Sequence, residues 1–189
     1  MSRKTKICTP VVAAIFVLLG LFVQLMAAGA QDTSLDLLFD ELKKPDAAIW
    51  SQAEKKIWEL WSKSGSDSMD ILLERGKLAM NAGDLPKAVE HFTALTDHAP
   101  EFAEGWNARA TAFFMMHEYG LSVHDIEITL RLNPRHFGAL SGLGMIYETL
   151  DLPKDALRAF RAALAVHPNR PDLLEAVKRL EDKAAGTLL

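Results

Sequence analysis

Six histidines are the side chains in this chain best suited to chemistry, because imidazole binds divalent metals and transfers protons near neutral pH. They are His91, His98, His117, His124, His136 and His167. Three of them, His98, His136 and His167, stand close to prolines, where we expect solvent-exposed turns. None belongs to a pair of histidines four residues apart with a glutamate between them, the arrangement of a zinc helix. The spacing therefore predicts neither a metal site nor an acid–base pair.

No other pattern in the sequence indicates catalysis. It contains no glycine-rich phosphate loop and no nucleophile elbow, and the acidic residues are scattered rather than paired. The single cysteine, Cys8, lies in a basic leader and is lost if that leader is removed. We expect a protein that is not an enzyme, with no catalytic residue, no bound metal and no cofactor.

The segment that ends at Ala30 differs from all that follows. Basic residues at the start precede an unbroken apolar run from Val11 to Leu19, which Leu21 to Met26 extend with only Gln24 polar. Small residues follow from Ala27 to Ala30. This order is typical of a secretory signal peptide, with cleavage before Gln31. We therefore expect an exported protein, periplasmic or secreted. An uncleaved membrane anchor is the alternative, since Pro10 to Ala28 is nearly as long as the roughly 20 residues that span a bilayer.

Composition limits the partners. Hydrophobic residues make up 49% of the chain and charged residues 24%, as expected for a packed core with an ordinary soluble surface. The net charge is −4, and removal of the basic leader makes the remainder more acidic. A mildly acidic chain with no basic block is a poor ligand for nucleic acid or anionic lipid. We expect a protein or peptide partner, and a membrane only if the leader stays in place.

A regular repeat organises the rest of the chain. Pro100, Pro134 and Pro168 are equally spaced, and proline ends helices. Other columns keep the same step, alternating small and large residues at helical spacing. The small columns are Gly76, Ala110 and Gly144, and Ala88, Ser122 and Ala156. One large column is Phe92, Ile126 and Phe160, and another is large in two of three units, with Ala79, Phe113 and Tyr147. Such columns predict two tightly packed antiparallel helices per unit, with Gly76 and Gly144 where helices touch.

This pattern resembles the tetratricopeptide repeat (TPR), whose period of about 34 residues equals the interval between the three prolines. Trp106 falls on the early aromatic position of that family, and the small and large columns fall on its packing positions. The resemblance implies an all-α solenoid of antiparallel helix pairs. The middle unit departs most, with Ser122, Ile126 and Thr129 off the pattern. The similar turns beginning at Asp84 and Asp151 are one residue closer than two full periods, which predicts that the third unit's turn is rebuilt by one residue.

The leader, a segment that matches no repeat, and the repeats with their capping helix give the expected domains. Residues 1–30 form the leader, and residues 32–64 an N-terminal helical hairpin. The repeats occupy residues 69–102, 103–136 and 137–170, and a capping helix follows at residues 171–183.

The hairpin has two interpretations, because three of the four tryptophans lie in it: Trp50, Trp58 and Trp61. Its apolar face could cover the first repeat, since terminal units of a solenoid need caps. Alternatively, it could expose an aromatic patch to a partner, since tryptophan is enriched at binding hot spots.

The resemblance places the binding surface on the concave face, which the first helix of each unit lines. The expected partner-binding residues are Leu73, Lys77, Met80, Asn81, Asn107, Thr111, Phe114, Met115 and Met145. Some TPR domains grip a C-terminal carboxylate with basic residues on these columns. Here Lys77 is the only base on them, so carboxylate capture is not expected.

Two functions follow. The first is an exported adaptor that binds a protein or peptide through the concave face of a short solenoid. The second is a membrane-anchored accessory subunit of an envelope assembly complex that docks through its tryptophan-rich hairpin.

Overall fold

The computed structural model describes residues 34–186, and every regular element within that range is a helix. Residues 34–42 are helical. The labelled helices are α2 (Ala47–Trp61), α3 (Asp67–Asn81), α4 (Leu85–His98), α5 (Ala103–Met115), α6 (Tyr119–Leu132), α7 (Phe137–Thr149), α8 (Pro153–Val166) and α9 (Pro171–Gly186). The expected leader and Cys8 lie outside the described residues. No described helix has both the length and the apolar character needed to cross a membrane.

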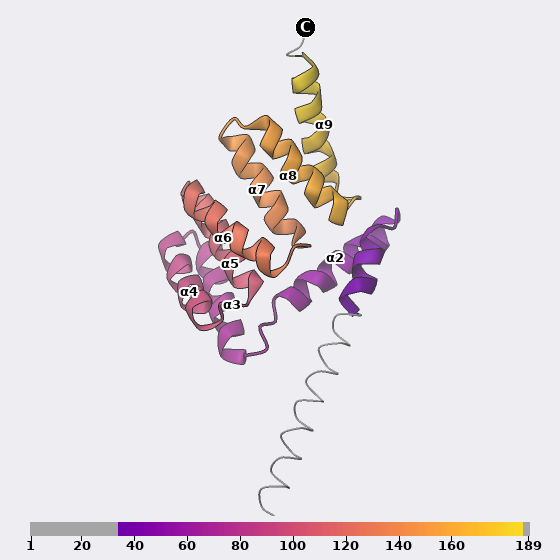
Figure 1. Cartoon of the computed structure of the whole chain (residues 1–189). Helices are drawn as coiled ribbons and strands as arrows, with labels where there is room; N and C mark the ends of the chain where they lie inside the picture. The colour runs from indigo at the N-terminus through magenta and orange to yellow at the C-terminus, as the bar shows by residue number, and fades with distance from the viewer. Residues whose placement is uncertain (1–33, 187–189) are drawn as a thin grey trace, which may run out of the picture. The chain divides into compact units, whose positions relative to one another are not determined.

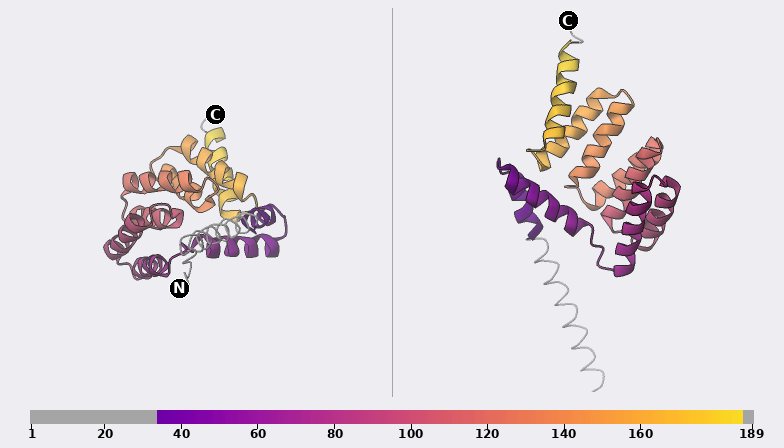
Figure 2. Two further views of the ribbon diagram at one scale, coloured as in Figure 1. Left: turned by 60° about the horizontal axis from the view of Figure 1, so that its bottom comes forward. Right: turned by 180° about the vertical axis from the view of Figure 1, so that it is seen from behind.

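The chain divides into two compact units, residues 1–38 and 39–189, and the second contains all the labelled helices. Within it, α3 packs on α4, α5 on α6 and α7 on α8, and α9 packs on α8 (Figure 1). The first helices of successive pairs, α3, α5 and α7, also contact one another. The stack of pairs therefore curves with the first helices on its inner side (Figure 2). The predicted all-α arrangement of helix pairs is confirmed.

The turn within each pair keeps the register of the repeat. A residue with positive φ stands at Gly83, His117 and Asp151, with φ of 80°, 63° and 54°. In each turn the next amide donates to a carbonyl five residues back, as Asp84 does to Ala79 and Leu152 to Tyr147. This bond is the helix-ending pattern that a left-handed residue allows. The prediction that the third turn is rebuilt by one residue is therefore wrong. The similar sequences at Asp84 and Asp151 are offset by one residue, but the backbone of the turns keeps the 34-residue period.

Because of this one-residue offset in sequence, the second helices of the first and third pairs are capped differently at their N-termini. Asp84 caps α4, because its carboxylate accepts a hydrogen bond from the Lys87 amide at 3.1 Å. The equivalent cap residue of α8 is Leu152, whose side chain makes no such bond. The residue similar to Asp84 in sequence, Asp151, instead occupies the left-handed position of the turn, which aspartate tolerates better than most residues.

The helix pairs are held by a ring from the second helix that packs on a small residue of the first. A Cβ added to Gly76 or Gly144 would come within 3.0 Å of the ring of Phe92 or Phe160, respectively. These glycines therefore lie where helices touch, as predicted. The middle pair uses Ala110 with Ile126 instead, both buried in one cluster. Where the second helix carries the smaller side chain, the first helix carries the larger one, so the summed volume stays similar.

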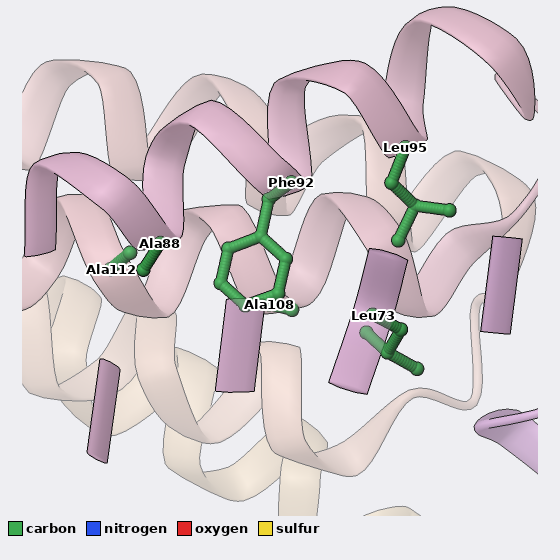
Figure 3. Close-up of a cluster of buried hydrophobic side chains, with 6 residues drawn as sticks. All are labelled: Leu73, Ala88, Phe92, Leu95, Ala108 and Ala112. Atoms are coloured by element: carbon green, nitrogen blue, oxygen red, sulfur yellow. The ribbon is translucent and has the colours of Figure 1, made fainter. Parts of the chain in front are cut away.

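Figure 3 shows the cluster between the first and second pairs, in which Phe92 and Leu95 pack with Leu73 and three alanines. Polar contacts add to this junction. The Arg109 guanidinium binds both oxygens of the buried Asp125, at 2.7 and 2.9 Å, and donates to Thr96 of α4 at 3.0 Å. The guanidinium of Arg109 in α5 thus connects α4 and α6. The off-pattern Ser122 is also used, since its hydroxyl donates to the Ala110 carbonyl at 2.8 Å.

The pairing of small and large residues predicts a compensating double mutant. Gly144→Ala places a methyl group 2.5 Å from the Phe160 ring, so we expect the free energy of unfolding to fall by about 1–3 kcal/mol. Adding Phe160→Ile should recover part of that loss, because the middle pair already combines alanine with isoleucine. Urea denaturation of the two single mutants and the double mutant measures the coupling.

Gly120→Ala is the matched control. It lies in α6 with no atom within 4 Å of an added Cβ, so helix propensity alone should raise stability by up to about 1 kcal/mol. Equal effects at Gly144 and Gly120 would contradict the packing argument.

Candidate functional site

A cleft opens on the inner side of the stack between α5 and α7, with α6 behind it. It brings together four of the predicted partner-binding residues: Asn107, Thr111 and Phe114 of α5, and Met145 of α7. The remaining walls come from Ala110, Ser122, Ile126, Gly138, Ala139, Gly142 and Ile146. No wall residue carries a charge. We call this cleft, together with Lys77 of α3, the groove, because Lys77 lies 3.6 Å from Glu104, which also binds Asn107 of the cleft.

Other residues that were predicted to bind a partner lie outside the cleft. Leu73 is completely buried in the cluster of the first pair, so the expectation that it contacts a partner is wrong. Its position on the helix points between α3, α4 and α5 rather than into the groove. Met80 packs against the same cluster while keeping part of its surface exposed. Asn81 and Met115 are exposed at the C-terminal ends of α3 and α5.

Phe114 has two roles. Its ring lies 5.8 Å from that of Tyr119, and it packs against the buried cluster of the second pair. It also lines the cleft. Replacing it would therefore disturb the core as well as the groove. Thr111 and Met145 are more exposed, and a change there alters the groove alone.

Glu104, which sequence reasoning missed, is the centre of a polar network at the edge of the groove. It is 5% exposed and lies in the first turn of α5. Its carboxylate is 3.6 Å from Lys77 Nζ and accepts hydrogen bonds from Asn107 Nδ2 at 3.0 Å and His136 Nε2 at 3.3 Å. The predicted groove residues Lys77 and Asn107 are thus tied to a buried carboxylate. The sequence did contain a hint of this role, because Glu104 lies one helical turn before the predicted groove residue Asn107 and therefore on the same face of the helix.

His136 and His167 are buried, so the expectation that they are exposed turn residues is wrong. His136 caps α7, because its Nδ1 accepts a hydrogen bond from the Ala139 amide at 3.1 Å. Nδ1 therefore carries no proton, and Nε2 is the atom that donates to Glu104. The ring is stacked on that of Trp61, with centroids 4.3 Å apart. His98, by contrast, is exposed as expected.

The tryptophans of α2 cause this burial. Trp58 lies edge-on to His136 and Phe137, and Trp50 lies edge-on to His167, with centroids 5.3 to 5.5 Å apart. A Cβ on Gly138 would come 2.6 Å from the Trp58 ring, so only glycine leaves room for this indole. The prediction that this segment covers the first repeat is wrong, because its rings pack at the start of α7 and the end of α8.

Polar contacts of Glu54 hold the middle of α2. Glu54 lies 3.4 Å from His167 Nε2 and 3.5 Å from Arg170. The hydrogen bond from His167 is the main reason why the pKa of Glu54 is lowered, and the Arg170 charge adds to it against the opposing effect of burial. Lys77 Nζ donates to Ser62 Oγ at 3.2 Å just after α2 ends. The helix is thus held near its middle by Glu54 and just after its C-terminus by Ser62.

No group of histidine, cysteine or acidic side chains able to hold a metal occurs between residues 34 and 186. His117 and His124 use their rings locally, on Tyr119 and Asp125. The arrangement supports binding through shape and hydrogen bonds.

The chain matches known repeat proteins over most of its length. The model of the Tetratricopeptide repeat family matches residues 73–115 and 116–173. A TPR repeat-containing protein of Rhizobium etli is 34% identical over 163 residues, which are 85% of this chain and 79% of the relative. The Hsp70-Hsp90 organizing protein 1 of Glycine max is 23% identical over 74% of this chain, a stretch that is 24% of that protein.

Solved structures of similar fold are TPR domains. The first TPR of Spaghetti (RPAP3) bound to the HSP90 peptide SRMEEVD has a TM-score of 0.59 and 20% identity, covering 62% of this chain and 93% of that domain. The TPR2B domain of yeast Sti1 in complex with pHsp70 has a TM-score of 0.58 and 19% identity, covering 62% and 99%. At these identities the likeness shows the fold, an all-α TPR-type solenoid.

The packing of α2 is tested by Trp58→Ala. Removing the indole leaves a cavity beside Gly138 and Phe137, so we expect α2 to loosen while the helix pairs stay folded. Hydrogen exchange should then speed up about 10-fold or more in α2 and remain nearly unchanged in α4 and α8. Lys55→Ala, on the exposed face of the same helix, is the control. Unchanged exchange in the Trp58 variant would show that the ring does not fix α2.

The lowered pKa of Glu54 predicts acid sensitivity. Stabilisation from an ionised carboxylate is complete above its unfolded value of 4.5 and is lost as the pH falls through the lower folded value. Tryptophan fluorescence should therefore report loosening of α2 in acid, below about pH 4.5. Glu54→Gln should remove this component and weaken α2 already at neutral pH. Identical acid profiles of the two proteins would contradict the assignment.

Proposed function

Since the chain belongs to the tetratricopeptide repeat family, we propose that it is a protein-interaction module whose groove holds an extended, largely uncharged segment of a partner protein. The observation that carries this proposal is the cleft between α5 and α7, whose walls include no charged side chain. Asn107 and Thr111 offer polar atoms at one wall, and Met145 and Phe114 offer apolar contact. Methionine adapts its shape to varied side chains, which suits a peptide site.

The charges around the groove argue for an uncharged ligand rather than an acidic one. Lys77, the only base on the predicted groove columns, is 3.6 Å from the buried Glu104 carboxylate. Its charge is therefore matched within the protein and attracts an anion weakly. The HSP90 peptide SRMEEVD bound by the similar Spaghetti domain is acidic and ends in a carboxylate. We expect the present groove to reject such a peptide.

The alternative function needs an exposed aromatic surface on the N-terminal hairpin. Trp50, Trp58 and Trp61 instead pack against His136, Phe137 and His167. These contacts use the rings to hold α2 in place, and each of the three tryptophans is only partly exposed, so the groove is the better candidate for the binding surface.

Export remains part of the proposal and rests on the sequence of residues 1–30. Cleavage before Gln31 would release the module into the periplasm or the medium. The mass of the intact protein recovered from the producing cell tests this. A protein that begins at Gln31 supports export with cleavage, and one that retains residues 1–30 in the membrane fraction supports the anchor.

Filling the groove should abolish peptide binding without unfolding the protein. Thr111→Arg and Met145→Arg place long charged side chains at the cleft from opposite walls. Peptides selected on the purified chain from a random display library provide the ligands, and fluorescence anisotropy measures their affinity. We expect each variant to weaken binding about 10-fold or more, or about 1.4 kcal/mol.

Leu121→Arg is the matched control, because Leu121 is a 50% exposed apolar residue of α6 outside the cleft. It should bind the selected peptides as the parent does. The peptide SRMEEVD serves as the acidic comparator and should not bind. Tight binding of SRMEEVD, or selected peptides that are insensitive to both groove variants, would refute the proposal.

A further inference from the structure

The outer face of α3 is the one first-helix face in the described stack that no preceding helix covers. In α5, α7 and α9 this face packs on the second helix before it, through three positions that recur once in every repeat. These positions are Gly105, Ala108 and Ala112 in α5, Ala139, Gly142 and Ile146 in α7, and Leu173, Ala176 and Leu180 in α9. Eight of these nine residues are buried, and Gly142 is partly buried.

The equivalent positions of α3 are Ile71, Glu74 and Leu78, and all three are exposed. Ile71 is 51% and Leu78 67% exposed, although both are large and apolar. The segment before α3 does not cover them, because the tryptophans of α2 pack at the start of α7 and the end of α8. The stack therefore ends in an apolar face. At its other end, α9 carries the charged Lys178 and Glu181 where a further second helix would pack.

Glu74 decides what kind of helix fits this face. At the three covered junctions the middle position is alanine, glycine or alanine, which lets the preceding helix approach closely. A glutamate there would be buried without a partner if an ordinary apolar helix docked, at a large desolvation cost. The covering helix must therefore place a cation opposite Glu74.

The α3 sequence itself carries that cation in the required place. Ile71, Glu74, Arg75 and Leu78 lie on one helical stripe, because their spacings are three, four and seven residues. The stripe has the same pattern in both directions along the helix: an apolar residue at each end and two opposite charges in the middle. Both charged side chains are exposed, so both are available to a partner.

We infer that the outer face of α3 binds the same face of a second copy of this chain, with the two α3 helices antiparallel about a twofold axis between Glu74 and Arg75. Each Ile71 then contacts Leu78 of the other copy, and each Glu74 faces the other Arg75. Such a contact is isologous and closes at two copies, as in most symmetric dimers. It lies apart from the groove, so it is independent of the proposed peptide binding.

The contact is small. One helix of 15 residues cannot bury the roughly 1,200–2,000 Å² of a standard stable interface, so the dimer is a reversible one. We expect a dissociation constant of about 10–100 μM. Sedimentation equilibrium of the purified chain over a range of concentrations that brackets this value should show the mean mass rising from one chain towards two.

Charge reversal tests the antiparallel pairing. Glu74→Arg creates a stripe with two cations, and Arg75→Glu creates one with two anions. Each variant alone should dimerise at least 10-fold more weakly than the parent, because like charges meet at the centre. An equimolar mixture of the two should form a heterodimer, because every cation then faces an anion. Leu78→Glu should be monomeric at all concentrations.

Circular dichroism confirms that each variant is folded, which the exposure of these positions favours. Glu127→Arg reverses an exposed charge on α6 and should dimerise as the parent does. A parent chain that remains monomeric overturns the inference and leaves a foreign helix as the occupant of this face. A dimer that tolerates both reversals, or a mixture that does not restore association, also overturns it. Peptide binding in the groove should be unchanged by Leu78→Glu, which separates this inference from the proposed function.

Discussion

The contact between a ring of the second helix and a small residue of the first fixes the spacing within each helix pair, and the stack depends on that spacing. Phe92 on Gly76 and Phe160 on Gly144 bring the two backbones closer than any side chain at the glycine would allow. The next pair must then approach at a matching distance. Because the first helices also contact one another, the stack curves, and the groove between α5 and α7 results from that curvature.

The groove is shaped further by a helix that is outside the repeats. α2 packs at the start of α7 and the end of α8, where Trp61 stacks on the buried His136 and Trp50 lies edge-on to the buried His167. One of these, His136, connects α2 to the buried Glu104, which in turn holds Lys77 and Asn107. A change in α2 is thus transmitted to two groove residues through a single carboxylate. The electrostatic character of the groove is set by this internal pairing and cannot be judged from Lys77 alone.

The two ends of the stack differ in the residues that they expose. At the C-terminal end, charged residues occupy positions where a further helix would pack, as a terminal unit of a solenoid requires. At the N-terminal end, Ile71 and Leu78 remain exposed around a pair of opposite charges. Since α2 packs elsewhere, the first repeat has no intramolecular cap among the described residues.

The sequence by itself determined the period, the helix pairs and the glycine contacts, because these arise from neighbours within one repeat that obey helical spacing. It also identified Asn107, Thr111, Phe114 and Met145, which the fold does bring to one cleft. It placed Leu73 in the groove by its column, in which Asn107 of the next repeat does line the cleft, whereas Leu73 is buried among residues of α4 and α5. The docking of α2, the burial of His136 and His167 and the role of Glu104 were decided only by the tertiary structure. Each depends on contacts between residues far apart in the chain, 32 positions for Glu104 with His136 and 113 for Glu54 with His167. No local periodicity specifies which distant turn a tryptophan will meet.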